Sequence, residues 1–225
     1  MIKTISCLAL SAVLAWPFGL VADSIDDDHF DGLQLIEKDS RGAIYGNPNA
    51  DWSSYSKIML DDAEVSFRKN WLRDQNRNRS LSMRVSDRDV ERIKNDLANL
   101  FNEVFLEELT ENGGYEVVSE AASDVMRISP KIADLDVYAP ETNWSGGANR
   151  SYTDSSGKMT LKLEIYDAVT GDLIAAANDR REARHRGYME WTTSISNRSD
   201  ARQMLRQWAI GLRERLQEAS APDPD

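Results

Sequence analysis

A long amphipathic pattern between residues 86 and 109 constrains the fold of this chain more than any other feature of its sequence. Apolar residues recur there every three or four positions, which places them on one face of an α-helix. They are Val90, Ile93, Leu97, Leu100, Phe101, Val104, Phe105 and Leu109. Ser86 to Asp89 has the form of a capping box with Asp in place of Glu, and Gly113-Gly114 can end the helix. Burying this face contributes on the order of 10 kcal/mol before entropy is subtracted, so the helix must dock on a sheet.

Alternating apolar and polar residues predict where that sheet is. We expect one or two half-buried strands between Tyr55 and Phe67 and a short strand at Tyr115 to Val118. A further strand spans residues 126 to 137, and its apolar residues change face near Ile132. Such a change of phase predicts a bulge, and Pro130 favours an edge or bulged position over a central one.

The second half of the chain predicts a hairpin and another helix. Residues 159 to 165 alternate between apolar and polar side chains, Gly171 lies in the turn that follows, and residues 173 to 177 return. A second amphipathic helix starts near Ser199 and ends before Pro222. Its apolar face consists of Leu205, Trp208, Leu212 and Leu216. We therefore predict an α+β fold with a mainly antiparallel sheet and two amphipathic helices packed on one face.

The first 22 residues have the pattern of an export signal. Lys3 is their only charged residue, and the apolar run from Cys7 to Ala15 is broken soon afterwards by Pro17 and Gly19. A transmembrane anchor needs about 20 apolar residues, so we favour a signal peptide cleaved after Ala22 and keep an uncleaved anchor as the alternative. We therefore expect a periplasmic protein.

We expect the rest of the chain to form one domain without covalent cross-links. Residues 23–50 are predicted to be an extended acidic lead-in with one short strand, residues 51–219 a single α/β domain, and residues 220–225 a disordered tail. Cys7 is the only cysteine and lies at the start of the apolar run instead of just after it, so no lipid attachment is expected. A mature chain without cysteine has no disulfide, thiolate metal site or cysteine nucleophile. We also expect no transmembrane helix in the mature chain.

The chain is strongly acidic. Its formal net charge is −11, and removing residues 1–22 takes away Lys3 and no acid, which leaves −12. A chain of this charge is repelled as a whole by phosphate groups, so we expect neither nucleic acid nor a bare anionic bilayer as its partner.

No motif in the sequence identifies a catalytic, cofactor-binding or metal-binding site. His29 and His185 are the only histidines, and nothing in the sequence brings them together. Residues 27 to 32 approach the start of a calcium loop, but His29 occupies a ligand position and Lys38 stands at the twelfth position. A carboxylate pair for glycoside chemistry is defined by separation in space, which a sequence does not show. A carboxylate-dependent hydrolase acting on cell-wall material is therefore the alternative function, and we assign no cofactor.

One basic cluster stands out in this acidic chain. Its candidate docking residues are Arg68, Lys69, Trp71, Arg73, Arg77 and Arg79. As a docking patch, the arginines would bind an anionic partner of the envelope, such as an acidic protein face, a cell-wall component with its carboxylates or lipid phosphates, with Trp71 as an aromatic anchor. As a structural feature, the same arginines would neutralise acids of the same fold. We favour the structural interpretation and keep the docking patch as the alternative.

Several stretches resemble a bacterial family known as domain of unknown function 3313. They are residues 55–67, the helix that starts at Ser86, residues 124–135 and residues 161–179, and the segment from Ile165 to Gly171 with the later Asp179-Arg180 pair is most similar. The resemblance covers residues 32 to 184 and implies an exported protein, usually anchored by a lipid on a cysteine after the signal. This chain lacks that cysteine, so the resemblance implies a free periplasmic member of a family without an assigned activity. We therefore expect a non-catalytic accessory or binding protein of the cell envelope.

Overall fold

A computed structural model describes residues 30, 32–137, 152–153, 157–182, 190–191 and 194–221 of the chain. The expected signal peptide, both histidines and residues 222–225 lie outside this part. The domain boundaries predicted at residues 22, 50 and 219 remain predictions. Within the described residues, no helix is both long and apolar enough to span a bilayer.

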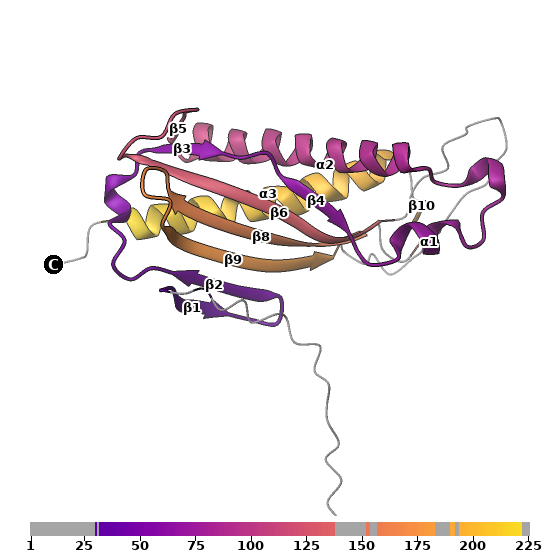
Figure 1. Ribbon diagram of the computed structural model, residues 1–225, viewed down its shortest axis with the longest axis horizontal. Helices are drawn as coiled ribbons and strands as arrows, with labels where there is room; N and C mark the ends of the chain where they lie inside the picture. Colours follow the sequence, from indigo (N-terminus) through magenta and orange to yellow (C-terminus); the bar gives the residue numbers. More distant parts are fainter. Residues whose placement is uncertain are drawn as a thin grey trace, which may run out of the picture.

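One curved sheet forms the centre of the molecule (Figure 1). In the described ranges it has eight strands in the order β1-β2-β9-β8-β6-β3-β5, and β4 also pairs with β6. The strands are β1 (Gln34–Lys38), β2 (Gly42–Gly46), β3 (Lys57–Leu60), β4 (Glu64–Phe67), β5 (Glu116–Val117), β6 (Val125–Val137), β8 (Gly157–Asp167) and β9 (Leu173–Glu182). Strands β1, β2, β9, β8 and β6 pair antiparallel, whereas β3 and β4 run parallel to β6, and β5 to β3. The predicted α+β class is confirmed, with a mixed sheet.

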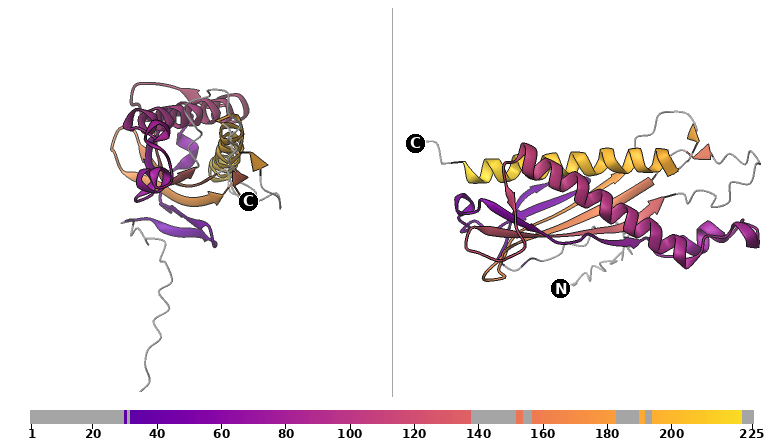
Figure 2. Two further views of the ribbon diagram at one scale, coloured as in Figure 1. Left: turned by 90° about the vertical axis from the view of Figure 1, so that its right-hand side faces the viewer. Right: turned by 90° about the horizontal axis from the view of Figure 1, so that it is seen from above.

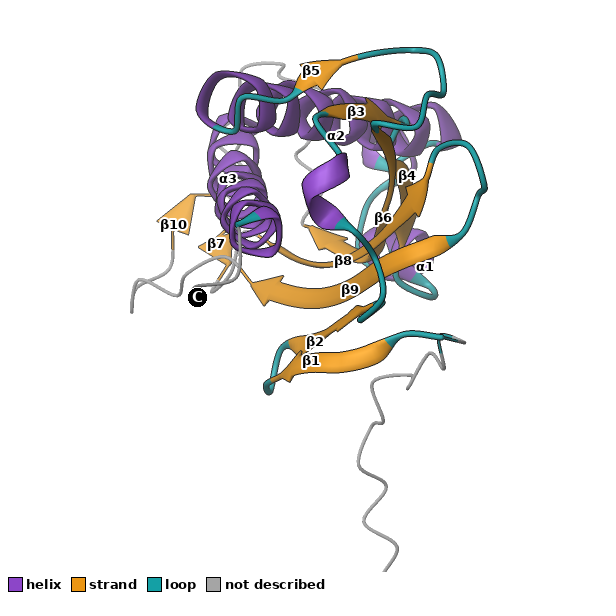
Figure 3. Cartoon of the chain, turned by 90° about the vertical axis from the view of Figure 1, so that its left-hand side faces the viewer, coloured by secondary structure: helices purple, strands orange, loops and turns teal. Residues whose placement is uncertain are grey.

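Two long helices cover the concave side of this sheet (Figures 2 and 3). They are α2 (Asp87–Glu107) and α3 (Ser194–Ser220), and α3 begins five residues before the predicted start. The shorter elements are η1 (Trp52–Ser54), α1 (Trp71–Asn76), η2 (Leu81–Met83), the π-helical turn η3 (Glu108–Asn112) and a separate two-stranded antiparallel sheet of β7 (Tyr152–Thr153) and β10 (Glu190–Trp191). The Ser86 capping box is present, because Ser86 and Asp89 each accept the other's backbone N–H. Gly114 has a φ of +77°, which confirms the predicted end of the helical segment.

The main core lies between the sheet and these two helices. Phe101 and Phe105 of α2 are fully buried and stack with ring centroids 3.9 Å apart. Leu205 of α3 and the inward-facing residues of β6 and β8 complete the same cluster. Because each buried large apolar side chain contributes about 1.5 to 3 kcal/mol, this layer supplies most of the folding free energy.

A buried ion pair joins η3 to α3 beside this core. Arg213 Nε donates to Glu108 Oε1 at 2.7 Å, and Asn112 donates to the other carboxylate oxygen at 3.0 Å. The side chain of Glu108 is 7% exposed and that of Arg213 is 20% exposed. A charge this deeply buried requires its partner, so the pair fixes how the end of the α2 segment sits on α3.

The predicted phase change in β6 is confirmed as a bulge. The register of β6 against β8 shifts between Ala133 and Asp136, and Asp134 has a φ of +51°. The expected position of Pro130 is wrong, because β6 lies in the middle of the sheet. The carbonyl of Ile128 accepts from Asp61 at the end of β3, so the backbone of Pro130, two residues on, faces the interruption between β3 and β4. At this place no neighbouring strand requires the N–H that proline lacks.

The segment that most resembles the family, Ile165 to Gly171, forms the end of β8 and the turn that leads to β9. The carboxylate of Asp167 accepts the backbone N–H groups of Thr170 at 2.7 Å and Val169 at 2.9 Å, and the hydroxyl of Tyr55 at 2.9 Å. The bond from the Thr170 backbone contributes most to holding the pKa of Asp167 below its ordinary value of 3.8. Gly171 closes the turn with a φ of +75°. This segment therefore has a structural role.

Residues 34–46 form a second hairpin that extends the sheet beyond β9, where the sequence predicted a lead-in with one short strand. Every residue of β1 is exposed, so neither face of the strand has to be apolar. Its sequence therefore lacks the alternating apolar pattern that predicts a strand. Gly42 is required at the junction, because a Cβ there would lie 1.8 Å from the carbonyl oxygen of Asn178 in β9. The side-chain oxygen of Asn178 also accepts the N–H of Ala43 at 2.7 Å, which ties the hairpin to β9.

Candidate functional site

The arginines of the predicted docking patch gather around one acid. Arg68, Arg73 and Arg77 lie 2.8, 3.3 and 3.1 Å from the carboxylate of Asp74. Hydrogen bonding from Arg68 contributes most to lowering the pKa of Asp74. This arrangement supports the interpretation that the cluster neutralises acids of its own fold. Lys69 is exposed nearby, and Arg79 Nη1 donates to the carbonyl of Met83 at 3.4 Å.

Trp71 does not belong to that surface. Its side chain is 1% exposed, stacks on Phe67 with ring centroids 3.9 Å apart, and donates Nε1–H to the carbonyl of Val137 at 2.8 Å. The predicted role of Trp71 as a surface anchor is therefore wrong. A tryptophan among arginines looks exposed in a sequence, because its partner Val137 is far away along the chain.

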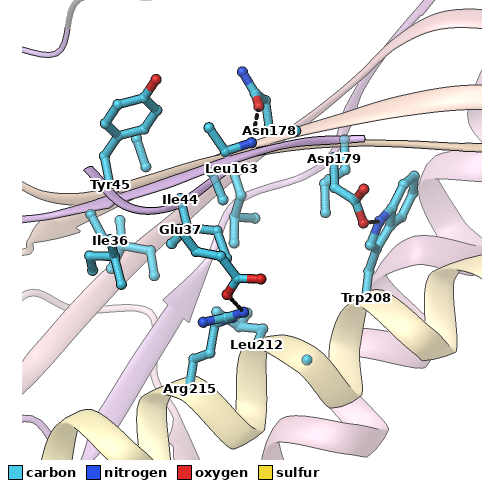
Figure 4. Close-up of a pocket in the computed structure, with 18 of the residues that line it drawn as sticks. Ile36, Glu37, Ile44, Tyr45, Leu163, Asn178, Asp179, Trp208, Leu212 and Arg215 are labelled. Carbon is cyan, nitrogen blue, oxygen red and sulfur yellow. Dashed lines mark hydrogen bonds and ion pairs between the residues drawn. The ribbon is translucent and has the colours of Figure 1, made fainter. Parts of the chain in front are cut away.

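A cavity of about 500 Å³ lies between α3 and the part of the sheet formed by β1, β2 and β9 (Figure 4). The strand registers place Leu163, Ala177 and Ile44 in one row across its floor. The adjacent row contains Ile165, Ala175 and Gly46, and Ile36 of β1 packs over Gly46. The floor is therefore aliphatic, and small residues keep it open.

Helix α3 forms the opposite wall of the cavity. Trp208, Leu212 and Arg215 project from it toward the sheet (Figure 4), and Gly211 lies among the lining residues. A Cβ at Gly211 would meet nothing within 4 Å, so packing does not require glycine there. Glycine inside a helix costs about 1 kcal/mol relative to alanine. The fold tolerates this cost, and the result is a wider cavity.

Polar side chains at the rim are bonded to one another. Arg215 donates to Glu37 across the mouth of the cavity, from α3 to β1. Trp208 Nε1 and Arg181 Nε each donate to Asp179 Oδ2 at 2.8 Å (Figure 4 shows the tryptophan bond). The rim therefore pairs each of these donors with an acid of the protein itself.

Asp39, in the turn of the β1–β2 hairpin, accepts hydrogen bonds that favour its ionised form. The backbone N–H of Arg41 donates to it at 2.8 Å and the guanidinium of Arg41 donates at 2.8 and 3.0 Å. These bonds, with the backbone bond first, lower the pKa of Asp39 below 3.8. Such a carboxyl does not hold a proton near neutral pH.

Sequence reasoning did not find this cavity. The signal that could have pointed to it is a set of small residues, Ala175 and Ala177 in a strand and Gly211 inside a helix. In the described part of the chain, no group of three or more His, Cys, Asp or Glu side chains could hold a metal ion.

Comparison with known proteins decides the family. The model of the family described as "Protein of unknown function (DUF3313)" matches residues 25–212. The chain belongs to the DUF3313 family. This match confirms the resemblance seen in the sequence and extends it at both ends. No curated protein matches this DUF3313 chain.

Two solved structures of bacterial proteins are partly similar to this DUF3313 protein. The PelC dodecamer from Paraburkholderia phytofirmans is 9% identical, covers 75% of this chain and 96% of its own, and has a TM-score of 0.39. The rare lipoprotein B from Shewanella oneidensis is 10% identical, with 72% of this chain and 92% of its own covered and a TM-score of 0.27. Because TM-scores below 0.5 do not establish a shared fold, these likenesses carry no argument about function.

Proposed function

We propose that this protein is a non-catalytic accessory or binding protein of the periplasm, and that the cavity beside α3 holds the aliphatic part of its ligand. The observation that carries this proposal is the open, aliphatic cavity, at whose rim Glu37 is paired with Arg215 and Asp179 with Trp208. Its volume falls within the range of about 300 to 1,000 Å³ that is usual for ligand sites. The signal-like pattern of residues 1–22 supports export.

The lining favours an aliphatic ligand over a polar one. A polar ligand would have to displace Glu37 from Arg215 or Asp179 from Trp208 before it could form its own hydrogen bonds. Breaking such pairs leaves charges or donors unsatisfied, which costs about 1 to 3 kcal/mol for each group. An aliphatic chain contacts the floor residues without this cost, and each methylene that leaves water contributes about 0.8 kcal/mol.

The carboxylates near the cavity do not favour the alternative hydrolase. An acid–base pair needs one carboxyl that holds a proton and one that is ionised. Three of the four acids that line the cavity, Glu37, Asp39 and Asp179, each form an ion pair with an arginine, and the pKa of Asp39 is lowered; Glu218 is the fourth. This pattern supports a binding role.

A cavity-filling variant tests the proposal. Gly211→Leu places a side chain in the cavity, and Gln203→Leu adds the same side chain to an exposed position of the same helix. The probe is cis-parinaric acid, a fatty acid that fluoresces in apolar surroundings. We expect saturable binding by the parent protein and by Gln203→Leu, and affinity at least about tenfold lower for Gly211→Leu, a change of 1.4 kcal/mol. Absence of saturable binding by the parent, or equal binding by both variants, would contradict the proposal.

A further inference from the structure

A short basic loop protrudes beyond α1. Residues 77–84 contain Arg77, Arg79 and Arg84 and no acid. Leu81 lies in the middle of the loop and is 83% exposed, more than any other large apolar side chain among the described residues. Arg84 is exposed as well. We call residues 77–84 the basic tip.

The base of the basic tip is held firmly by the fold. The side chain of Asn76 accepts the N–H of Val85 at 2.8 Å and donates to the carbonyl of Val85 at 2.9 Å. Val85 is 4% exposed and packs with Trp71 in a small apolar cluster of its own. Inside the loop, the N–H of Met83 donates to the carbonyl of Ser80 at 2.9 Å. The exposure of Leu81 is therefore a property of an ordered loop.

Positive charge extends from the basic tip onto α1. Arg73 and Arg77 are both 66% exposed, and they share the single carboxylate of Asp74 with Arg68. Arg68 has a second partner in Asp136 at 2.9 Å. Guanidinium groups therefore outnumber the carboxylates that they contact, and the surplus charge lies on the exposed side.

We propose that the basic tip docks on an anionic lipid surface, with Leu81 entering the headgroup region and the arginines bonding lipid phosphates. Exposed apolar side chains flanked by arginines are typical of segments that lie in a membrane interface. Guanidinium groups form paired hydrogen bonds with phosphate oxygens. This proposal is independent of the ligand assigned to the cavity.

The size of the loop favours a lipid surface over a protein partner. A stable protein interface buries about 800 Å² on each side, which takes about 20 to 30 residues. The basic tip has eight residues, far fewer than that. A lipid headgroup layer can deform around such a tip and needs no complementary shape.

The net charge of −11 does not oppose this docking locally. Charges more than about 8 Å away are largely screened at physiological ionic strength. Strand β4 leads to α1 at one end of the long axis of the molecule (Figure 1), so acids at the opposite end lie far from the basic tip, whereas Asp87 and Asp89 follow it within five residues of the chain. The expectation that the whole chain avoids an anionic bilayer therefore does not extend to this end of it.

Vesicle sedimentation tests the proposal with the full-length protein as it is purified from cells. The vesicles contain phosphatidylcholine with or without phosphatidylglycerol. Because an arginine near an anionic surface is worth about fivefold in binding, Arg77→Gln with Arg84→Gln should weaken binding to anionic vesicles roughly 25-fold. Leu81→Ser should weaken it about tenfold or more. All variants share one N-terminus, so any lipid affinity of that segment cancels in these ratios.

Matched controls separate docking from folding. Val169→Ser removes an apolar side chain that is 61% exposed on the turn between β8 and β9, and Arg206→Gln removes an exposed charge from α3, so both should bind like the parent. Arg77→Lys with Arg84→Lys keeps the charge and should keep most of the binding. Equal binding of the parent to vesicles with and without phosphatidylglycerol would overturn the proposal. The proposal would also be overturned if Leu81→Ser bound anionic vesicles as tightly as the parent does. The same holds if the parent bound them no more tightly than the double glutamine variant does.

Discussion

Replacing Gly211 with alanine should stabilise the protein. The helix-propensity difference between glycine and alanine is about 1 kcal/mol in the interior of a helix such as α3. The new methyl group meets no atom within 4 Å of its position and covers apolar cavity surface, which adds at most about 0.8 kcal/mol. The free energy of unfolding should therefore rise by about 1 to 2 kcal/mol. For a chain of this size, that raises the melting temperature by about 2 to 8 °C.

Thermal unfolding followed by circular dichroism at 222 nm measures this shift, and Gly42→Ala provides the contrast. A Cβ at Gly42 would lie 1.8 Å from the carbonyl oxygen of Asn178, so the backbone must move and stability should fall by about 1 to 3 kcal/mol. If Gly211→Ala instead lowers the melting temperature, α3 packs against the sheet too closely to leave a cavity at Gly211. The cavity, and the function built on it, would then be refuted.

Three further predictions test other parts of the structure. Arg213→Met leaves the buried carboxylate of Glu108 without its ion pair, so the free energy of unfolding measured in urea should fall by about 3 to 5 kcal/mol. Adding Glu108→Leu should recover most of that loss, and a double variant as unstable as the single one would contradict this. Because the pKa of Asp167 is lowered in the folded protein, its carboxylate stabilises the fold above pH 4, and this contribution is lost as the pH falls through the lowered pKa. The urea midpoint of Asp167→Asn should therefore lie below that of the parent at pH 7 and approach it toward pH 2. A difference in midpoint that stays constant with pH would contradict this. Ser86→Ala removes the cap of α2 and should cost about 1 kcal/mol by the same assay, and no change would show that the capping box does not contribute.

Local signals predicted the elements that local physics determines. The capping box at Ser86 and the end of the helical segment at Gly113-Gly114 depend on backbone groups only a few residues away, so the sequence contains the information. The β8–β9 hairpin has the alternating pattern of a strand with one buried face, and its turn is capped by Asp167. The bulge in β6 was visible as a change of phase.

The parts that escaped prediction depend on contacts between distant residues. Strand β1 is exposed throughout and is held by pairing with β2, so its sequence lacks a periodic signal. Trp71 is buried because Val137 and Phe67 surround it, which its basic neighbours in the sequence conceal. Pro130 is tolerated in a central strand only because β3 ends and β4 begins beside it. The cavity likewise exists because Gly211 on α3 faces small residues of β9.

The hairpin of β1 and β2 lines the cavity but does not contribute to the main apolar core. Among the described residues, none from either strand belongs to the main apolar core between the sheet and the helices. The hairpin nevertheless supplies Ile36, Glu37 and Ile44 to one side of the cavity. Ile36, Glu37 and Ile44 are therefore positions where preference for the proposed ligand can be redesigned while the melting temperature stays close to that of the parent.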